Sequence, residues 1–164
     1  MNVLQKILHK KPMTRTVTLS AIIAALYAAT TVLLAPISYG PMQVRIAEAL
    51  TVLPYLYPEA IPGLYFGCMA ANIWGGYGPI DIFGGSAVTL MAALLTFYLR
   101  RFGKPWLAPL PPVVLNALAV GYYLHLLTET PLGLSIGMVG AGQLVACFGL
   151  GLPLLYALSR RNLF

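Results

Sequence analysis

Acidic, amide and aromatic side chains lie inside long apolar runs of this sequence, where a polar group is unfavourable unless it has a partner or a function. A carboxylate accepts hydrogen bonds, an amide both donates and accepts them, and an aromatic ring stacks on a flat or cationic solute. Such a set predicts the chemistry of a pocket for a small polar solute. The side chains concerned are Glu48, Asn72, Trp74, Asp81, Asn116, His125 and Gln143.

The basic residues predict how these side chains are arranged across a membrane. The sequence has ten Lys and Arg residues, and all but Arg45 gather in three clusters beside apolar runs. By the positive-inside rule such clusters face the cytoplasm, so both termini are expected there. Arg45 breaks the pattern, which makes it a further candidate for the pocket. The clusters are Lys6, Lys10, Lys11 and Arg15; Arg100, Arg101 and Lys104; and Arg160 and Arg161.

The composition is that of a protein embedded in lipid. The chain of 164 residues is 59% hydrophobic and only 9% charged, whereas a soluble domain is about 25% charged. Its net charge of +6 comes from residues that flank apolar runs and are not interleaved with aromatics on one face. This pattern fits a topology signal facing a lipid bilayer better than a nucleic-acid interface.

Six apolar runs predict an all-α integral membrane protein, a six-transmembrane-helix bundle that forms a single domain over residues 1–164. Residues 1–13 would form a cytoplasmic segment. The second run covers about 22 Å as a helix, less than the hydrocarbon core of about 30 Å, and Pro54 and Pro62 interrupt the second and third. Pro153 is expected to kink the sixth. The runs are 14–35, 43–57, 59–74, 81–99, 111–127 and 135–158.

In this topology the polar residues of five spans lie near the outer surface and only Asn116 lies near mid-membrane. Each also has a plain structural interpretation. Arg45 and Glu48, three residues apart, would equally pair with each other, and Asp81 would equally cap the fourth helix. The others would serve as interfacial or interhelical groups: His125, Trp74 with Tyr77, Asn116 and Gln143.

Small residues repeat at intervals of four along the first span, an arrangement that lets two helices approach closely in lipid. The two interpretations left open are packing inside the chain's own bundle and a docking face for another membrane subunit. The residues are Ala21, Ala24, Ala25, Ala28 and Ala29.

The sequence lacks the motifs of common catalytic sites. Gly103-Lys104 is followed by Pro105 and does not form a phosphate-binding loop, so the chain is not expected to hydrolyse ATP. No zinc-hydrolase or serine-hydrolase motif is present. Cys68 and Cys147 lie inside predicted spans, where thiols behave as small apolar residues. We therefore expect no catalytic residue, metal or cofactor.

Three blocks of unusual composition resemble the QueT family, the substrate-binding (S) components of energy-coupling factor transporters associated with the uptake of queuosine precursors. The resemblance covers about residues 14–158. The blocks are Pro36-Ile-Ser-Tyr-Gly-Pro-Met-Gln-Val-Arg-Ile-Ala-Glu-Ala-Leu-Thr-Val-Leu-Pro54, Leu107-Ala-Pro-Leu-Pro-Pro-Val-Val-Leu-Asn116 and Gly142-Gln-Leu-Val-Ala-Cys147.

This resemblance implies a multi-pass protein of a prokaryotic plasma membrane that works with a transmembrane coupling subunit and two cytoplasmic ATPases. It would bind a 7-deazaguanine such as preQ1, preQ0 or queuine from outside and then topple to release it inward. The alanines of the first span match the family's docking surface for the coupling subunit.

The resemblance also suggests a chemical fit. The ring N1–H and exocyclic amine of such a base can donate together to one carboxylate, that of Glu48 or Asp81. Trp74 or Tyr39 would stack on the base, and Asn72, Asn116 and Gln143 would bind its other polar edges. Three alternatives stay open: an S component for another vitamin-like solute, a membrane assembly protein without transport function, and an intramembrane enzyme.

Overall fold

The structure, a computed structural model, describes residues 13–40, 44–76 and 78–161, and these are helical apart from short connections. Lys6, Lys10, Lys11 and Tyr77 lie outside this part of the chain. The helices in chain order are α2 (Met13–Leu33), α3 (Ala35–Ser38), η1 (Ile46–Tyr55), α4 (Ala60–Gly75), η2 (Ile80–Gly85), α5 (Ser86–Leu99), η3 (Arg100–Phe102), η4 (Pro105–Leu107), α6 (Leu110–Thr128), α7 (Leu132–Gln143), η5 (Leu144–Gly151) and α8 (Leu152–Arg161).

Each of the six apolar runs coincides with one helix or with consecutive helical segments. The ends of these helical regions lie within about one turn of the expected positions. Four stretches are long and apolar enough to cross a membrane, and η1 and α4 are shorter, as the prolines in the second and third runs indicated. The chain is therefore an all-helical membrane protein. The four stretches are Met13–Leu33, Ile80–Phe102, Pro105–Thr128 and Leu132–Arg160.

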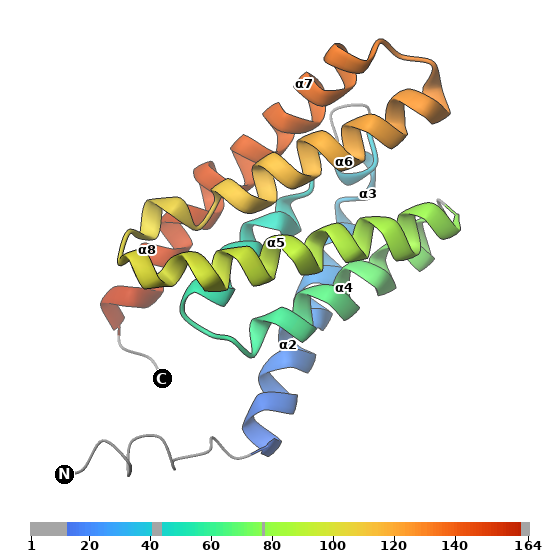
Figure 1. Cartoon of the computed structure of the whole chain (residues 1–164). Coiled ribbons are helices and arrows are strands. Elements are labelled where there is room, and N and C mark those ends of the chain that lie inside the picture. Colours follow the sequence, from blue (N-terminus) through green and yellow to red (C-terminus); the bar gives the residue numbers. More distant parts are fainter. Residues whose placement is uncertain (1–12, 41–43, 77, 162–164) are drawn as a thin grey trace, which may run out of the picture.

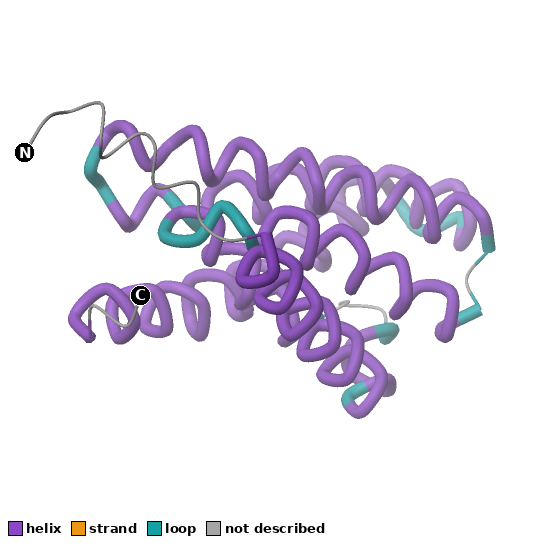
Figure 2. Tube along the Cα trace, turned by 90° about the horizontal axis from the view of Figure 1, so that it is seen from below, coloured by secondary structure: helices purple, strands orange, loops and turns teal. Residues whose placement is uncertain are grey.

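The two ends of the molecule differ in the connections they carry. The start of α2, the connection between α5 and α6, and the end of α8 lie toward the lower and left side of Figure 1. The connection between α6 and α7 lies at the opposite, upper right end. Figure 2, turned by 90°, shows only short loops between the helices. The described part of the chain therefore forms one helical body.

Helix α2 packs against α4 through glycines of α4. A Cβ atom on Gly67 would lie 2.8 Å from the carbonyl oxygen of Ala24 and 2.9 Å from the Cβ of Tyr27. A Cβ on Gly63 would lie 2.6 Å from the carbonyl oxygen of Ser20. The two helix backbones are therefore in direct contact, which only glycine permits at these positions.

This contact divides the alanines of α2 into two sets. Ala24, which faces Gly67, and Ala28 are half-buried, whereas the other three are exposed. The internal-packing interpretation thus fits the first set, and an outward surface remains for the second. The exposed set is Ala21, Ala25 and Ala29.

Five helical segments depart from α geometry, and three of them, η1, η2 and η5, lie next to buried polar side chains. Segment η1 is a 3₁₀ helix of 10 residues, while η2 and η5 are π-helical. Runs of 3₁₀ helix beyond about 4 residues are uncommon, and π segments often occur at functional sites. Segment η5 precedes Pro153, whose missing N–H disrupts the hydrogen bonding of the preceding turn. The sixth apolar run is therefore π-helical directly before the segment that contains Pro153, the residue expected to kink it.

Candidate functional site

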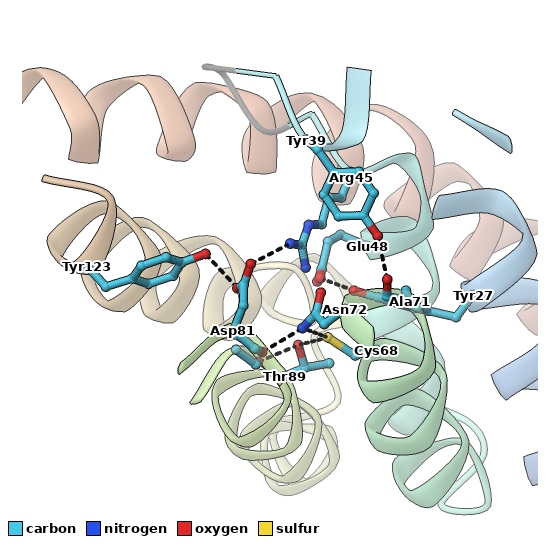
Figure 3. Close-up of polar contacts among 11 residues, drawn as sticks. Tyr27, Tyr39, Arg45, Glu48, Cys68, Ala71, Asn72, Asp81, Thr89 and Tyr123 are labelled. Carbon is cyan, nitrogen blue, oxygen red and sulfur yellow. Dashed lines mark hydrogen bonds and ion pairs between the residues drawn. The ribbon is translucent and has the colours of Figure 1, made fainter. Parts of the chain in front are cut away.

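Six of the predicted site residues meet in the interior of the bundle, although they come from different segments of the chain. All six are buried; Glu48 is 1% exposed, Asp81 2% and Arg45 6%. Figure 3 shows several of these side chains pointing toward one another. We call this set the polar cluster: Arg45, Glu48, Asn72, Asp81, Asn116 and Gln143.

Glu48, on η1, connects three helices. Its Oε1 accepts a hydrogen bond of 2.5 Å from the Tyr27 hydroxyl on α2, and its Oε2 accepts one of 3.3 Å from Asn116 Nδ2 on α6. Its backbone carbonyl accepts a hydrogen bond of 2.6 Å from Thr51 Oγ1. A carboxylate offers about four lone-pair sites. Glu48 therefore retains the capacity to accept further hydrogen bonds.

Asp81, in the first turn of η2, also reaches across the bundle. Its Oδ1 accepts a hydrogen bond of 2.5 Å from the Tyr123 hydroxyl on α6, and its Oδ2 lies 3.9 Å from Arg45 Nη2. Its place in the first turn also suits a carboxylate, in line with the capping interpretation. Asp81 thus connects helices, and Arg45 approaches it although the sequence spacing had suggested a pair with Glu48.

Asn72, on α4, fixes the start of η2 against the cluster. Its Nδ2 donates a hydrogen bond of 2.7 Å to the carbonyl oxygen of Asp81 and lies 3.5 Å from Cys68 Sγ. A Cβ on Gly85 would lie 3.1 Å from Asp81 Oδ1 and 3.2 Å from Asn72 Nδ2, so this position has little room for a side chain. Asn72 Oδ1, and Nε and Nη2 of Arg45, are buried without a hydrogen-bond partner.

The polar cluster borders a small cavity. Its volume is about 10 Å³, which is the space of about one water molecule. A second, apolar cavity of about 160 Å³ lies beside it between η2, α5 and α6, and the two share Gly85 and Val120 in their walls. Tyr123 borders the second cavity. The residues around the first are Arg45, Glu48, Gly85, Thr89, Asn116, Val120 and Gln143.

Two of the expected site residues lie elsewhere, and one lies at the edge of the cluster. Trp74, near the end of α4, is 64% exposed. His125 Nδ1 lies 2.6 Å from the carbonyl oxygen of Thr130, so it supports the turn between α6 and α7. The ring of Tyr39 lies 5.4 Å from the Arg45 guanidinium, and its hydroxyl donates to the carbonyl oxygen of Ala71.

Several contributors were not expected from the sequence. Tyr27 and Tyr123 donate to the two acids, and Cys147 lies 3.5 Å from Gln143 Oε1. Tyr27 is the one hydroxyl-bearing aromatic in the first span, a signal that could have been used. Within the described residues no group of three His, Cys, Asp or Glu is placed to hold a metal ion.

Comparison with known proteins identifies the family. The model of the QueT transporter family matches residues 17–160. A protein of Lactococcus lactis subsp. cremoris (strain MG1363) named "Queuosine precursor transporter QueT" is 27% identical over 151 residues, which cover 85% of this chain and 89% of that protein. No solved structure matches the chain significantly. Because the family model extends over nearly the whole chain, the protein belongs to the QueT transporter family.

Proposed function

We propose that this protein is the solute-binding subunit of an energy-coupling factor importer and that its solute is a 7-deazaguanine precursor of queuosine. The observation that carries the proposal is the buried polar cluster, which combines two carboxylates, a guanidinium and three amides in the interior of the bundle. Charged side chains inside membrane helices are unfavourable in lipid and commonly mark the pathway of a solute or an ion. The Lactococcus relative, named for queuosine precursors, supports the choice of solute.

The cluster complements the polar edge of such a base. Either Glu48 or Asp81 accepts the ring N1–H and the exocyclic amine, and the second acid holds the ammonium of an aminomethyl substituent. Asn72, Asn116 and Gln143 bind the remaining edges, and Tyr39 supplies the aromatic face. Trp74 and His125 are not part of this proposal, because their side chains lie outside the polar cluster.

Binding requires the bundle to open around the cluster. A fused two-ring base is several times larger than the cavity of about 10 Å³. The adjoining cavity of about 160 Å³ shares two wall residues with it. Tyr123 lines the larger cavity and donates a hydrogen bond to Asp81, so its movement is one change that would bring the larger cavity and the polar cluster into contact.

Uptake of a radiolabelled 7-deazaguanine by cells tests this function. Uptake should require both this chain and an energy-coupling module with active ATPases. Uptake of a different vitamin-like solute alone would favour another S component, and solute turnover without any ATPase would favour an enzyme. A chain that supports no uptake and binds no solute would contradict the transport proposal and favour the assembly-protein alternative.

The proposed topology has six spans and places both termini and the α5–α6 connection in the cytoplasm. Its support is the shared position of the basic connections at one end of the bundle. Cysteines introduced at Thr130 and Lys104 should differ in intact cells, because an impermeant thiol reagent should label only the former. The native Cys68 and Cys147 are buried and give little background. Labelling at Lys104 in intact cells would contradict the orientation.

The exposed alanines of α2 are the proposed docking face for the coupling subunit. Ala25→Leu should abolish transport and complex assembly while the purified chain keeps its melting temperature and solute affinity, because Ala25 faces outward. Ala24→Leu is the matched control: it enlarges a residue packed on Gly67, so it should lower the melting temperature. If Ala25→Leu destabilises the chain as much as Ala24→Leu, or transports normally, the docking assignment is wrong.

A further inference from the structure

Arg45 presents unused hydrogen-bond donors to the interior of the polar cluster. The residue is 6% exposed, and its Nε and Nη2 atoms have no hydrogen-bond partner. Burying a charged donor without a partner is unfavourable, so such a group is usually completed by a ligand or by water. Arg45 also lines the small cavity, so its side chain borders the space that the solute would enlarge.

The neighbours of Arg45 hold the guanidinium in place without occupying these donors. The Tyr39 ring lies 5.4 Å from the guanidinium carbon, and the Tyr39 hydroxyl is fixed by a hydrogen bond of 2.7 Å to the carbonyl oxygen of Ala71. Asp81 Oδ2 lies 3.9 Å from Nη2, a distance that gives charge attraction without a hydrogen bond. Figure 3 shows Arg45 between Tyr39, Asp81 and Glu48.

The cluster therefore offers a planar donor group beside carboxylate acceptors. The matching ligand edge has a carbonyl oxygen next to N–H donors, which is the edge of a 6-oxo base and not of a 6-amino base. We propose that Arg45 is the specificity-determining residue that binds the exocyclic oxygen of the base, while Glu48 or Asp81 accepts the adjacent N–H groups. This inference rests on the proposed function and assigns one atom of the solute to one side chain.

A cycle of two proteins and two ligands tests this assignment. The ligands are 7-deazaguanine and its 6-thio analogue, which keeps the N1–H and amine donors but replaces the oxygen with sulfur, a weak acceptor. The proteins are the wild type and Arg45→Lys, which keeps the positive charge near Asp81 but lacks the planar fork of donors. The wild type should bind the oxo base about 10- to 100-fold more tightly than the thio base, and Arg45→Lys should reduce this ratio to below about threefold.

Arg101→Lys is the matched control. The Arg101 guanidinium also lies over an aromatic ring, 3.7 Å from the centre of the Tyr98 ring, but Arg101 is exposed in η3, after α5. It should keep the wild-type ratio. If Arg45→Lys fails to fold, Arg45→Gln takes its place, and its melting temperature is measured in parallel. A wild-type ratio of oxo-base to thio-base affinity in a folded Arg45 variant, or equal binding of both bases by the wild type, would overturn the role of Arg45. Either result would leave the proposed function intact. A wild type that binds neither base would overturn the proposed function and this inference together.

Discussion

Replacing Glu48 with Gln is expected to weaken the binding of a 7-deazaguanine by about 30-fold to several-thousand-fold. Truncating one partner of a buried charged contact costs about 2 to 5 kcal/mol, and each 1.4 kcal/mol is about tenfold in affinity. Glutamine keeps the shape of the side chain but turns one accepting oxygen into a donor. That donor would face either the ligand's own N–H groups or the Tyr27 hydroxyl, which now donates to Oε1.

Asp81→Asn and Glu129→Gln complete the set. Asp81→Asn tests the second acid of the polar cluster. Glu129→Gln changes an exposed acid between α6 and α7, so it should leave the affinity unchanged. Calorimetry gives the affinity and a melting curve gives the stability of each variant. If the acids only hold the helices together, the melting temperature should fall while the folded fraction binds normally. Near wild-type affinity in both Glu48→Gln and Asp81→Asn would remove the carboxylates from the site.

Replacing Gly67 with Ala is expected to destabilise the chain by about 1 to 3 kcal/mol, the usual effect of overpacking a filled interface. The new Cβ would meet the backbone of Ala24 at 2.8 Å and the Cβ of Tyr27 at 2.9 Å, and neither can move aside as a flexible side chain would. Displacing α2 also moves the Tyr27 hydroxyl away from Glu48. We therefore expect both a lower melting temperature and weaker solute binding.

Gly137→Ala is the control for this substitution. Gly137 lies inside α7, and a Cβ there would meet no atom within 4 Å. Alanine is favoured over glycine in a helix by up to about 1 kcal/mol, so this variant should be at least as stable as the wild type. Equal stability of Gly67→Ala and Gly137→Ala would contradict the close contact between α2 and α4.

The positions of the helices follow from the sequence because long apolar runs separated by Gly, Pro and basic residues leave few other arrangements in lipid. The local geometry does not follow in the same way. Whether residues 46–55 form 3₁₀ or α turns depends on what packs against them; a Cβ on Gly151 of η5, for example, would lie 2.9 Å from the carbonyl oxygen of Ala49. Such contacts join residues far apart in the chain.

The candidate site was predicted in part for a similar reason. Acids and amides within apolar runs are conspicuous, so Glu48, Asp81 and Asn116 could be identified by residue type, and the two acids also by their shared depth. Tyr27 resembles an ordinary apolar residue until its hydroxyl is seen against Glu48. Trp74 illustrates the reverse: its depth matched that of the acids, but the position of a ring around its helix decides whether it faces the interior or the surface, and here it is 64% exposed.

From helix periodicity alone, the five alanines of α2 were predicted to form one surface of the helix. The structure separates them because each residue of an α-helix turns by about 100°, and Gly67 contacts only one edge of the stripe. The sequence could not indicate which edge of the alanine stripe packs inside the bundle, because the glycines that contact this edge lie on another helix, α4.

Calorimetric titration of the purified, detergent-solubilised chain with a 7-deazaguanine, in the absence of any coupling subunit or ATPase, tests the central claim most directly. The claim requires saturable binding of one base per chain. If the chain is folded, as verified by its melting curve, and binds no 7-deazaguanine, the claim is contradicted.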